Sequence, residues 1–178
     1  SHKSVLILGD NLLIGQGLGT TLETHLDREG ASILAFPVNN PQEYGVVEFD
    51  ETGKVISLEE KPANPKSHFA VPGIYFMDEN ASEYAGQLKP SSRGELEITD
   101  LNRLYLEDET LQVKLLGRGY AWLDTGTHDS LAEAGEFVKA LEKRQGLKIA
   151  CLEENALEQG FISKQQAKAL GEQLSKTK

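Results

Sequence analysis

The most regular pattern in the chain is an alternation between short apolar runs and segments whose apolar residues recur at helical spacing. Residues 4–8 and 31–38 are nearly continuous apolar runs, which is typical of strands buried on both faces of a sheet. Between them, Leu18, Leu22 and Leu26 recur at the spacing of one helix face. This order predicts a βαβ unit with parallel strands and a right-handed crossover.

The central part of the chain predicts a hairpin. Two strand-like runs, 44–49 and 54–60, flank a turn at Asp50-Glu-Thr-Gly53.

The remaining pattern predicts strands within 67–77 and 111–116 and helices around 98–105, 131–141 and 163–174. The last of these helices is opened by a capping-box pair, Ser163 and Gln166. We therefore expect the α/β class: a mixed, mostly parallel sheet flanked by helices, with an inserted antiparallel hairpin, in a single domain over 1–178.

Composition narrows the class of protein. The 178 residues include 18 basic and 28 acidic side chains, a net charge of −10, and the 39% hydrophobic fraction is typical of a globular protein. The acidic balance disfavours a nucleic-acid partner, and no apolar run approaches the roughly 18 residues of a membrane span. The single cysteine, Cys151, cannot form an internal disulfide and fits a reducing compartment. We expect a cytoplasmic protein.

Two aspartates follow strand-like runs. Asp10 comes directly after the first run, and Asp124 follows Tyr120-Ala-Trp-Leu123. Ligands of α/β sheets collect at the carboxyl ends of strands, and two carboxylates can jointly hold Mg²⁺. Each aspartate could equally serve a turn or cap the helix after it, and their distance in sequence does not decide between these alternatives.

A charged cluster ends the predicted hairpin. Glu60 and Lys61 stand directly before Pro62, which stops further pairing. A lysine can bind a phosphate group, and a carboxylate can accept hydrogen bonds from sugar hydroxyls. The alternative is a solvent-exposed edge strand protected by its charges.

The four histidines and the single cysteine do not have the spacing of a zinc site, and the sequence has no nucleophile-elbow, P-loop or dinucleotide-binding motif. His25 lies on a predicted helix face, and His68 lies in a predicted loop.

Taken together, six stretches of the chain resemble one enzyme family. They are Leu8-Gly-Asp-Asn11, Tyr44-Gly-Val-Val-Glu-Phe-Asp50, Ser57-Leu-Glu-Glu-Lys-Pro62, Ala70-Val-Pro-Gly-Ile-Tyr-Phe76, Arg93-Gly-Glu-Leu-Glu-Ile-Thr-Asp100 and Gly117-Arg-Gly-Tyr-Ala-Trp-Leu-Asp-Thr-Gly-Thr-His128. In their order and spacing they are similar to the glucose-1-phosphate thymidylyltransferases, sugar nucleotidyltransferases that make dTDP-glucose for deoxysugar synthesis such as the dTDP-rhamnose pathway. The resemblance implies the nucleotide-diphospho-sugar transferase fold and, for the whole protein, a homo-tetramer.

The resemblance also implies a reaction and a set of site residues. The phosphate of glucose 1-phosphate would attack the α-phosphorus of dTTP with the help of Mg²⁺, and pyrophosphate would leave. The implied roles are Mg²⁺ binding for Asp10 and Asp124, a place at the nucleotide for Asn11, phosphate binding for Lys61, sugar-hydroxyl binding for Glu60, close backbone approach for Gly45, a main-chain contact for Val71, and the lining of the sugar pocket for Thr99 and Trp122. Asp10, Asp124 and Lys61 would be the catalytic residues.

One part of the family pattern is absent. The phosphate-loop signature G-G-x-G-T-R-L does not occur in these 178 residues, nor do the family's first strand and its thymine-reading residues. We therefore expect a chain truncated at its N-terminus, with Ser1-His2 as the scar of a tag and with little or no activity by itself. Two alternatives stay open: a non-catalytic sugar-phosphate-binding or oligomerisation fragment, and a sugar nucleotidyltransferase that uses UTP.

Overall fold

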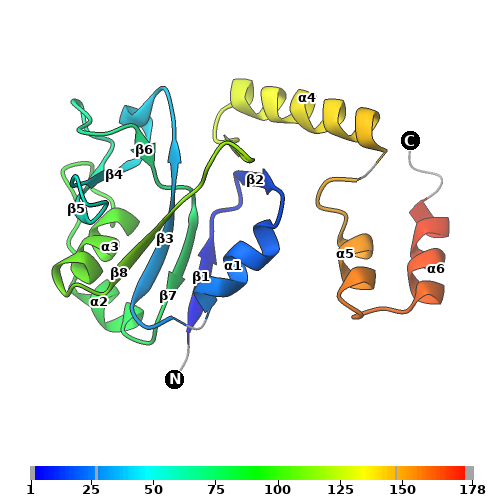
Figure 1. Ribbon diagram of the computed structural model, residues 1–178, viewed down its shortest axis with the longest axis horizontal. Helices are drawn as coiled ribbons and strands as arrows, with labels where there is room; N and C mark the ends of the chain where they lie inside the picture. The colour runs from blue at the N-terminus through cyan, green and yellow to red at the C-terminus, as the bar shows by residue number, and fades with distance from the viewer. Residues whose placement is uncertain (1–2, 27, 147, 175–178) are drawn as a thin grey trace. The chain divides into compact units, whose positions relative to one another are not determined.

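The computed structural model describes residues 3–26, 28–146 and 148–174 (Figure 1), so the expected tag scar at 1–2 lies outside the described residues. The chain divides into two compact units, Ser1–Gly126 and Thr127–Lys178. The first unit contains all the described strands, and the second contains only helices.

The first unit is built on one large sheet and one small one. The large sheet has the order β1-β7-β3-β6-β4-β5, with β8 paired to β3, and the small sheet pairs β2 with β9. The strands are β1 (Ser4–Ile7), β2 (Asn11–Gly15), β3 (Ala31–Pro37), β4 (Gly45–Phe49), β5 (Val55–Glu60), β6 (Phe69–Ala70), β7 (Ile74–Met77), β8 (Leu111–Leu115) and β9 (Tyr120–Asp124). The helices of this unit are α1 (Leu18–Leu26), α2 (Ala81–Gln87) and α3 (Ile98–Glu107), with a 3₁₀ turn at Pro41–Glu43.

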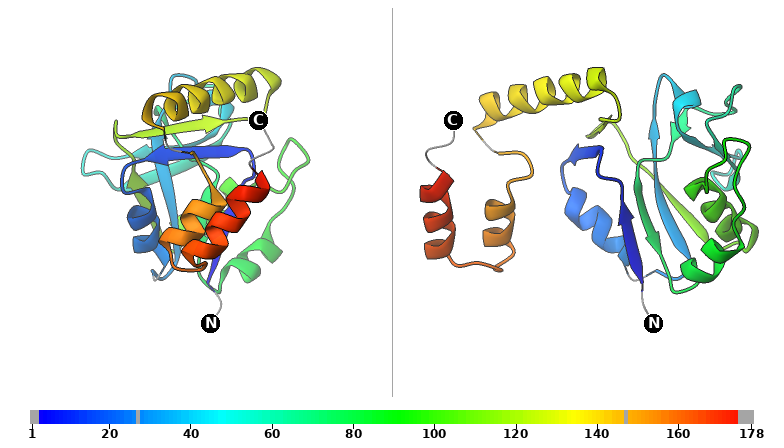
Figure 2. Two further views of the ribbon diagram at one scale, coloured as in Figure 1. Left: turned by 90° about the vertical axis from the view of Figure 1, so that its right-hand side faces the viewer. Right: turned by 180° about the vertical axis from the view of Figure 1, so that it is seen from behind.

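Alternation along β3 creates two hydrophobic clusters, one on each face of the sheet. Ile33 and Ala35 pack in a cluster with Leu101 and Tyr105 of α3, whereas Leu34 packs in a second cluster that Leu22 of α1 joins. Successive side chains of a strand point to opposite faces, so one buried strand supplies both clusters. Figures 1 and 2 show α1 on one side of the sheet and α2 and α3 on the other. The expected layered α/β class, a sheet flanked by helices, is confirmed.

The expectation of a mostly parallel sheet is wrong. In the part of the chain that the structure describes, β3 and β8 are the only parallel neighbours, and the other pairs are antiparallel. The reason is β7, which follows the hairpin excursion without a crossover helix and inserts between β1 and β3. Strands β1 and β3 therefore run in the same direction, as a βαβ unit requires, but they are not neighbours.

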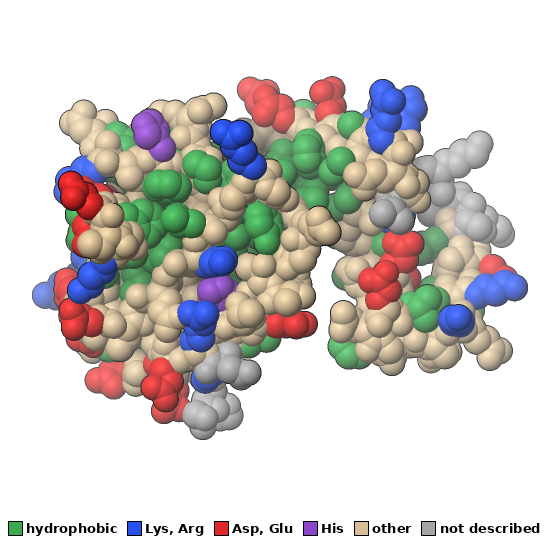
Figure 3. Space-filling model, viewed as in Figure 1, with side chains coloured by type: hydrophobic (Ala, Val, Ile, Leu, Met, Phe, Trp, Pro, Cys, Tyr) green, Lys and Arg blue, Asp and Glu red, His purple; other side chains and the backbone are tan. Residues whose placement is uncertain are grey.

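The expectation that residues 4–8 form a strand buried on both faces is also wrong. Strand β1 stands at the end of the strand order, and its only partner among the described strands is β7. Val5, Leu6 and Ile7 are 43%, 45% and 60% exposed. Figure 3 shows that hydrophobic side chains also remain visible over β3 and β8 on the face of the first unit that Figure 1 displays.

The hairpin forms where the sequence predicts it. Strands β4 and β5 pair antiparallel, with Gly45 opposite Glu60 at the open end. In the turn, the Asp50 carboxylate accepts hydrogen bonds from the amides of Thr52 and Lys54, and Gly53 has a φ of +85°. This left-handed conformation explains why a glycine completes the turn.

The second unit contains α4 (His128–Gln145), α5 (Leu152–Glu158) and α6 (Lys164–Leu174). Thr127 caps the start of α4, where its side chain accepts from the Ser130 amide. The predicted capping box of α6 is present: the Gln166 amide donates to Ser163 Oγ, and the Ser163 amide donates to Gln166 Oε1. Among the described residues, no helix has the length and apolar content needed to cross a membrane.

Candidate functional site

A pocket of about 220 Å³ in the first unit brings together all nine residues nominated from the sequence. These residues come from the segment between β1 and β2, from β4, from the end of β5, from the residue after β6, from the start of α3 and from β9. They are Asp10, Asn11, Gly45, Glu60, Lys61, Val71, Thr99, Trp122 and Asp124. The same pocket is lined by six further residues, Leu8, Glu43, Tyr44, Gly73, Tyr75 and Ile98.

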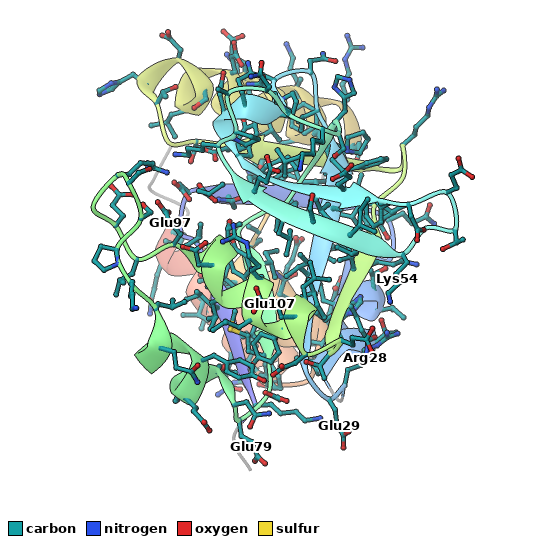
Figure 4. All side chains as sticks on the ribbon, turned by 90° about the vertical axis from the view of Figure 1, so that its left-hand side faces the viewer. Arg28, Glu29, Lys54, Glu79, Glu97 and Glu107 are labelled. Atoms are coloured by element: carbon teal, nitrogen blue, oxygen red, sulfur yellow. The ribbon has the colours of Figure 1, made fainter. Side chains whose placement is uncertain are left out.

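A larger hollow of about 990 Å³ lies elsewhere, between the hairpin and the segment formed by α3 and β8. Lys54 and Glu107, both visible in Figure 4, are among its lining residues. None of the nine nominated residues lines this hollow. Size alone therefore does not identify the candidate site, and the chemistry of the lining side chains does.

Asp10 and Asp124 lie close to each other in the pocket. The pairing of β2 with β9 sets Asn11 opposite Asp124, and the Thr125 amide donates to the Asp10 carbonyl at 2.7 Å. A Cβ built on Gly126 would lie 3.0 Å from Asp124 Oδ1 and 3.6 Å from Asp10 Oδ2. The two carboxylates therefore approach the same point in space, although they are distant in sequence.

This pair suits a cation that needs few protein ligands. Within residues 3–26, 28–146 and 148–174, the structure has no group of three or more His, Cys, Asp or Glu side chains arranged to bind a metal ion. Mg²⁺ is commonly held by one or two carboxylates, with water and substrate phosphates completing its shell. Two carboxylates at an open pocket fit that requirement, whereas a closed structural zinc site would need four ligands.

Asn11 joins three parts of the site. Its Oδ1 accepts hydrogen bonds from Trp122 Nε1 at 2.7 Å and from the Gly73 amide at 3.0 Å, and its Nδ2 donates to Asp10 Oδ1 at 2.9 Å. The Trp122 ring also packs against the Tyr44 ring, with a centroid distance of 4.9 Å. The Asn11 side chain thus fixes both an aromatic wall of the pocket and one of the two aspartates.

Glu60 and Thr99 also line the pocket, where they are joined by a hydrogen bond. Thr99 Oγ1 donates to Glu60 Oε2, and a Cβ on Gly45 would lie 2.9 Å from Thr99 Oγ1 and 3.3 Å from Glu60 Oε2. The Val71 amide, nominated as a main-chain contact, donates to the Gly45 carbonyl at 2.9 Å. The absence of a side chain at Gly45 therefore keeps the Glu60–Thr99 pair intact.

Arg93 links Glu60 to Glu97 beside the pocket; neither Arg93 nor Glu97 is among its lining residues, and neither was nominated from the sequence. Arg93 Nη1 lies 3.5 Å from Glu60 Oε1 and 3.5 Å from Glu97 Oε1, and Glu97, labelled in Figure 4, is buried and accepts from Ser91 Oγ. Both residues occur in the stretch Arg93–Asp100 that carried part of the resemblance, from which only Thr99 was selected. The available signal was an arginine six residues before that threonine and a glutamate two residues before it.

Lys61 has an unusual backbone. Its φ is +42°, a conformation that residues with a side chain rarely adopt, and its amide donates to the Tyr44 carbonyl at 3.0 Å. Such strained positions cluster at functional sites. The geometry carries the chain out of β5 while the lysine side chain remains at the pocket.

Two tyrosines of the pocket stay protonated. Burial, followed by the charges of Glu60 and Asp10, raises the pKa of the Tyr75 hydroxyl well above its usual range. Burial and the charge of Asp124 raise the pKa of Tyr44. Neutral hydroxyls in a pocket lined by carboxylates can donate hydrogen bonds to a polar ligand.

The remaining candidates lie away from this pocket. His25 is buried and forms a 2.5 Å hydrogen bond with Ser32, and His68 is exposed. Cys151 is a free, half-buried residue at the start of α5, in the second unit.

Comparison with known proteins agrees with these assignments of motif and fold. Residues 1–140 match the family model described as nucleotidyl transferase. Glucose-1-phosphate thymidylyltransferase of Neisseria meningitidis is 52% identical over 172 residues, which is 96% of this chain and 60% of that protein. The enzyme of the same name from Xanthomonas campestris is 54% identical, over 97% of this chain and 59% of its own length. The chain thus spans about 60% of the length of the curated relatives it matches.

Solved structures show the same fold. A protein of Bacillus anthracis assigned as a glucose-1-phosphate thymidylyltransferase, in complex with sucrose, is 41% identical and superposes with a TM-score of 0.65 over 76% of this chain and 54% of its own. UDP-glucose pyrophosphorylase in complex with UDP-glucose superposes with a TM-score of 0.63 at 23% identity, over 76% of this chain and 55% of its own. The second likeness concerns the fold alone.

Proposed function

The chain belongs to the nucleotidyl transferase family, and from that premise we propose that it carries the sugar-phosphate side and the metal-binding carboxylates of a glucose-1-phosphate thymidylyltransferase. The observation that carries this proposal is the convergence of all nine nominated residues on one pocket. These residues come from segments spread between Asp10 and Asp124, so their meeting is a property of the fold and not of local sequence.

The proposed reaction is an in-line displacement at phosphorus. A phosphate oxygen of glucose 1-phosphate forms a bond to the α-phosphorus of dTTP while the bridge between the α- and β-phosphates breaks, and pyrophosphate leaves with the bonding electrons. Such a reaction needs positioning and charge neutralisation more than a covalent nucleophile. A pocket lined by carboxylates, a lysine and hydrogen-bonding groups supports this type of chemistry.

Lys61 and Glu60 would bind glucose 1-phosphate. The Lys61 ammonium group supplies a positive charge for the phosphate, and Glu60 can accept hydrogen bonds from sugar hydroxyls. Thr99, paired with Glu60, and the Trp122 ring would line the sugar, and Gly45 and Val71 would contact it through the backbone.

Asp10 and Asp124 would hold Mg²⁺. Mg²⁺ held there would supply positive charge that offsets the negative charge developing on the substrate phosphates. The contribution of the chain is to hold the two carboxylates near one point, through the pairing of β2 with β9 and through the Thr125 amide.

We further propose that these 178 residues bind glucose 1-phosphate but do not complete the reaction, because the sequence has no G-G-x-G-T-R-L phosphate loop. The test is a calorimetric titration, in which glucose 1-phosphate, dTTP and Mg²⁺ are added to the chain separately and together. We expect heat from glucose 1-phosphate and none from dTTP. Binding of dTTP without glucose 1-phosphate would refute the sugar-side assignment, and rapid formation of dTDP-glucose would refute the expected inactivity.

A matched pair of variants identifies the pocket. Lys61→Met removes the proposed phosphate ligand, whereas Lys54→Met removes a lysine whose ion pair is with Glu109, outside the pocket. We expect the first variant to lose glucose 1-phosphate binding and the second to bind as the unaltered chain does. Equal affinities would place the ligand elsewhere.

A further inference from the structure

Gly126 occupies the position where the two aspartates approach each other. A Cβ on this residue would lie 3.0 Å from Asp124 Oδ1 and 3.6 Å from Asp10 Oδ2. Contacts as short as 3.0 Å to a short, hydrogen-bonded side chain require one of the groups to move. The 3.0 Å contact is tight, so a side chain here would displace the Asp124 carboxylate, whereas 3.6 Å from Asp10 is an ordinary contact distance; the bare α-carbon of Gly126 therefore lets Asp124 keep its place beside Asp10.

One oxygen of each carboxylate is already held by the protein. Asn11 Nδ2 donates to Asp10 Oδ1 at 2.9 Å, and the Gly126 amide donates to Asp124 Oδ1 at 2.8 Å. Among the described residues, no side chain or amide donates to the second oxygen, Oδ2, of either aspartate. Each carboxylate is thus oriented through one oxygen and keeps the other for a ligand.

The backbone conformation does not explain why residue 126 is a glycine. The φ of Gly126 lies outside the left-handed region, in contrast to glycines such as Gly53 and Gly146. An alanine at this position would therefore not suffer the strain of a left-handed backbone. What a side chain would disturb here is the space between the carboxylates.

We propose that Gly126 is a positioning residue for the divalent cation: its amide orients Asp124, and its lack of a side chain keeps room for the cation and its water ligands between Asp10 and Asp124. This inference rests on the proposed assignment of the two aspartates as Mg²⁺ ligands. Mg²⁺ keeps several waters at about 2.0–2.1 Å, so a methyl group beside both carboxylates would compete with that hydration shell.

The test measures Mn²⁺ binding, because Mn²⁺ accepts the same oxygen ligands and its free ion is counted directly by electron paramagnetic resonance. Gly126→Ala is compared with Gly119→Ala, a matched control in the segment before β9. Gly119 also has a φ outside the left-handed region, and nothing lies within 4 Å of its Cβ position. We expect Gly126→Ala to weaken Mn²⁺ binding by about tenfold or more, which is the usual range for residues that orient metal ligands, and Gly119→Ala to leave it unchanged.

Asp10→Asn and Asp124→Asn separate this inference from the proposed function. If both variants lose Mn²⁺ binding while Gly126→Ala binds as tightly as the unaltered chain, the inference about Gly126 is overturned and the metal assignment stands. If neither aspartate variant changes Mn²⁺ binding, the metal assignment fails and the inference fails with it. Thermal melting of each variant by circular dichroism shows whether a loss of binding reflects a loss of folding.

Competition by other cations adds a measurement, the preference between Ca²⁺ and Mg²⁺, that would not change if Gly126 had a purely structural role. Ca²⁺ binds at longer distances and with more ligands than Mg²⁺, so crowding by a methyl group should weaken Ca²⁺ binding more. We expect Gly126→Ala to lower the ratio of Ca²⁺ affinity to Mg²⁺ affinity, measured by displacement of Mn²⁺. An unchanged ratio together with unchanged affinities would contradict the crowding argument.

Discussion

Thr99 Oγ1 donates a hydrogen bond to Glu60 Oε2, and this bond links the first turn of α3 to the last residue of β5. The other oxygen of Glu60 lies 3.5 Å from Arg93 Nη1. Glu60 is therefore held from two sides before any ligand arrives. A carboxylate fixed in this way can accept hydrogen bonds from a ligand without first losing side-chain entropy.

Replacement of Gly45 should disturb this arrangement. In Gly45→Ala the new methyl group would lie 2.9 Å from Thr99 Oγ1 and 3.3 Å from Glu60 Oε2, so the pair must separate. We expect glucose 1-phosphate to bind at least about tenfold more weakly, a loss of roughly 1.4 kcal/mol, measured by calorimetry. Gly117→Ala is the control, because nothing lies within 4 Å of its Cβ position. Unchanged affinity in Gly45→Ala would show that the pair is not needed for sugar binding.

The strained backbone of Lys61 predicts a trade-off between stability and binding. Lys61→Gly removes a side chain from a residue with φ of +42°, and the relief of left-handed strain is worth about 1–2 kcal/mol. We expect a higher melting temperature together with loss of glucose 1-phosphate binding. Glu109→Gly is the matched control, since Glu109 has a φ of +56° and lies outside the candidate pocket. It should raise stability and leave binding intact, and a fall in stability of both variants would contradict the strain argument.

The local elements of this fold could be predicted because each depends on residues close in sequence. The turn at Asp50–Gly53, the capping box at Ser163 and the helix of Leu18–Leu26 all form where their patterns indicate. Strand direction could not be predicted in this way. The apolar run of β7 has the same pattern whether it is parallel or antiparallel to β3, and the insertion between β1 and β3 depends on pairing that no short pattern encodes.

In the candidate site, too, some features could be predicted from the sequence and others could not. Asp10, Lys61 and Asp124 stand at the ends of predicted strands, which made them candidates, but nothing in the spacing required them to share one pocket. Arg93 was missed because its contact with Glu60 arises from the loop before α3. Gly126 was missed because a glycine is informative only when the atoms beside it are known.

Buried His25 predicts that stability falls at acidic pH. Burial, followed by the charges of Arg28 and Lys114, lowers the pKa of the imidazole below its ordinary value of 6.5. The folded state therefore binds the proton more weakly than the unfolded state, so this contribution to stability is present above about pH 6.5 and is lost as the pH falls toward the lowered folded pKa. We expect the free energy of unfolding from urea titrations to decrease by up to about 1.4 kcal/mol per pH unit in that window.

Two variants separate this effect from general acid denaturation. His25→Gln cannot take up the proton, so its unfolding free energy should depend less on pH below 6.5 than that of the unaltered chain. His68→Gln, in which an exposed histidine is replaced, should retain the full dependence. A slope that stays the same in His25→Gln would mean that other groups cause the loss of stability.

Trp122 is the single tryptophan of the sequence and lies in the candidate pocket, so its fluorescence should report directly on the site. Its Nε1 donates to Asn11 Oδ1, which also accepts from the Gly73 amide. Asn11→Ala leaves both donors without that acceptor, at a cost of about 1–3 kcal/mol for a buried group. We expect a shifted emission maximum and a lower melting temperature in Asn11→Ala, and an emission change in the unaltered chain when glucose 1-phosphate is added.

Asn11→Asp keeps an acceptor for both donors but places a second negative charge beside Asp10, so its emission should stay close to that of the unaltered chain while the melting temperature falls. An emission maximum that responds equally in both variants would show that the indole is held by its ring packing against Tyr44 and not by the hydrogen bond to Asn11.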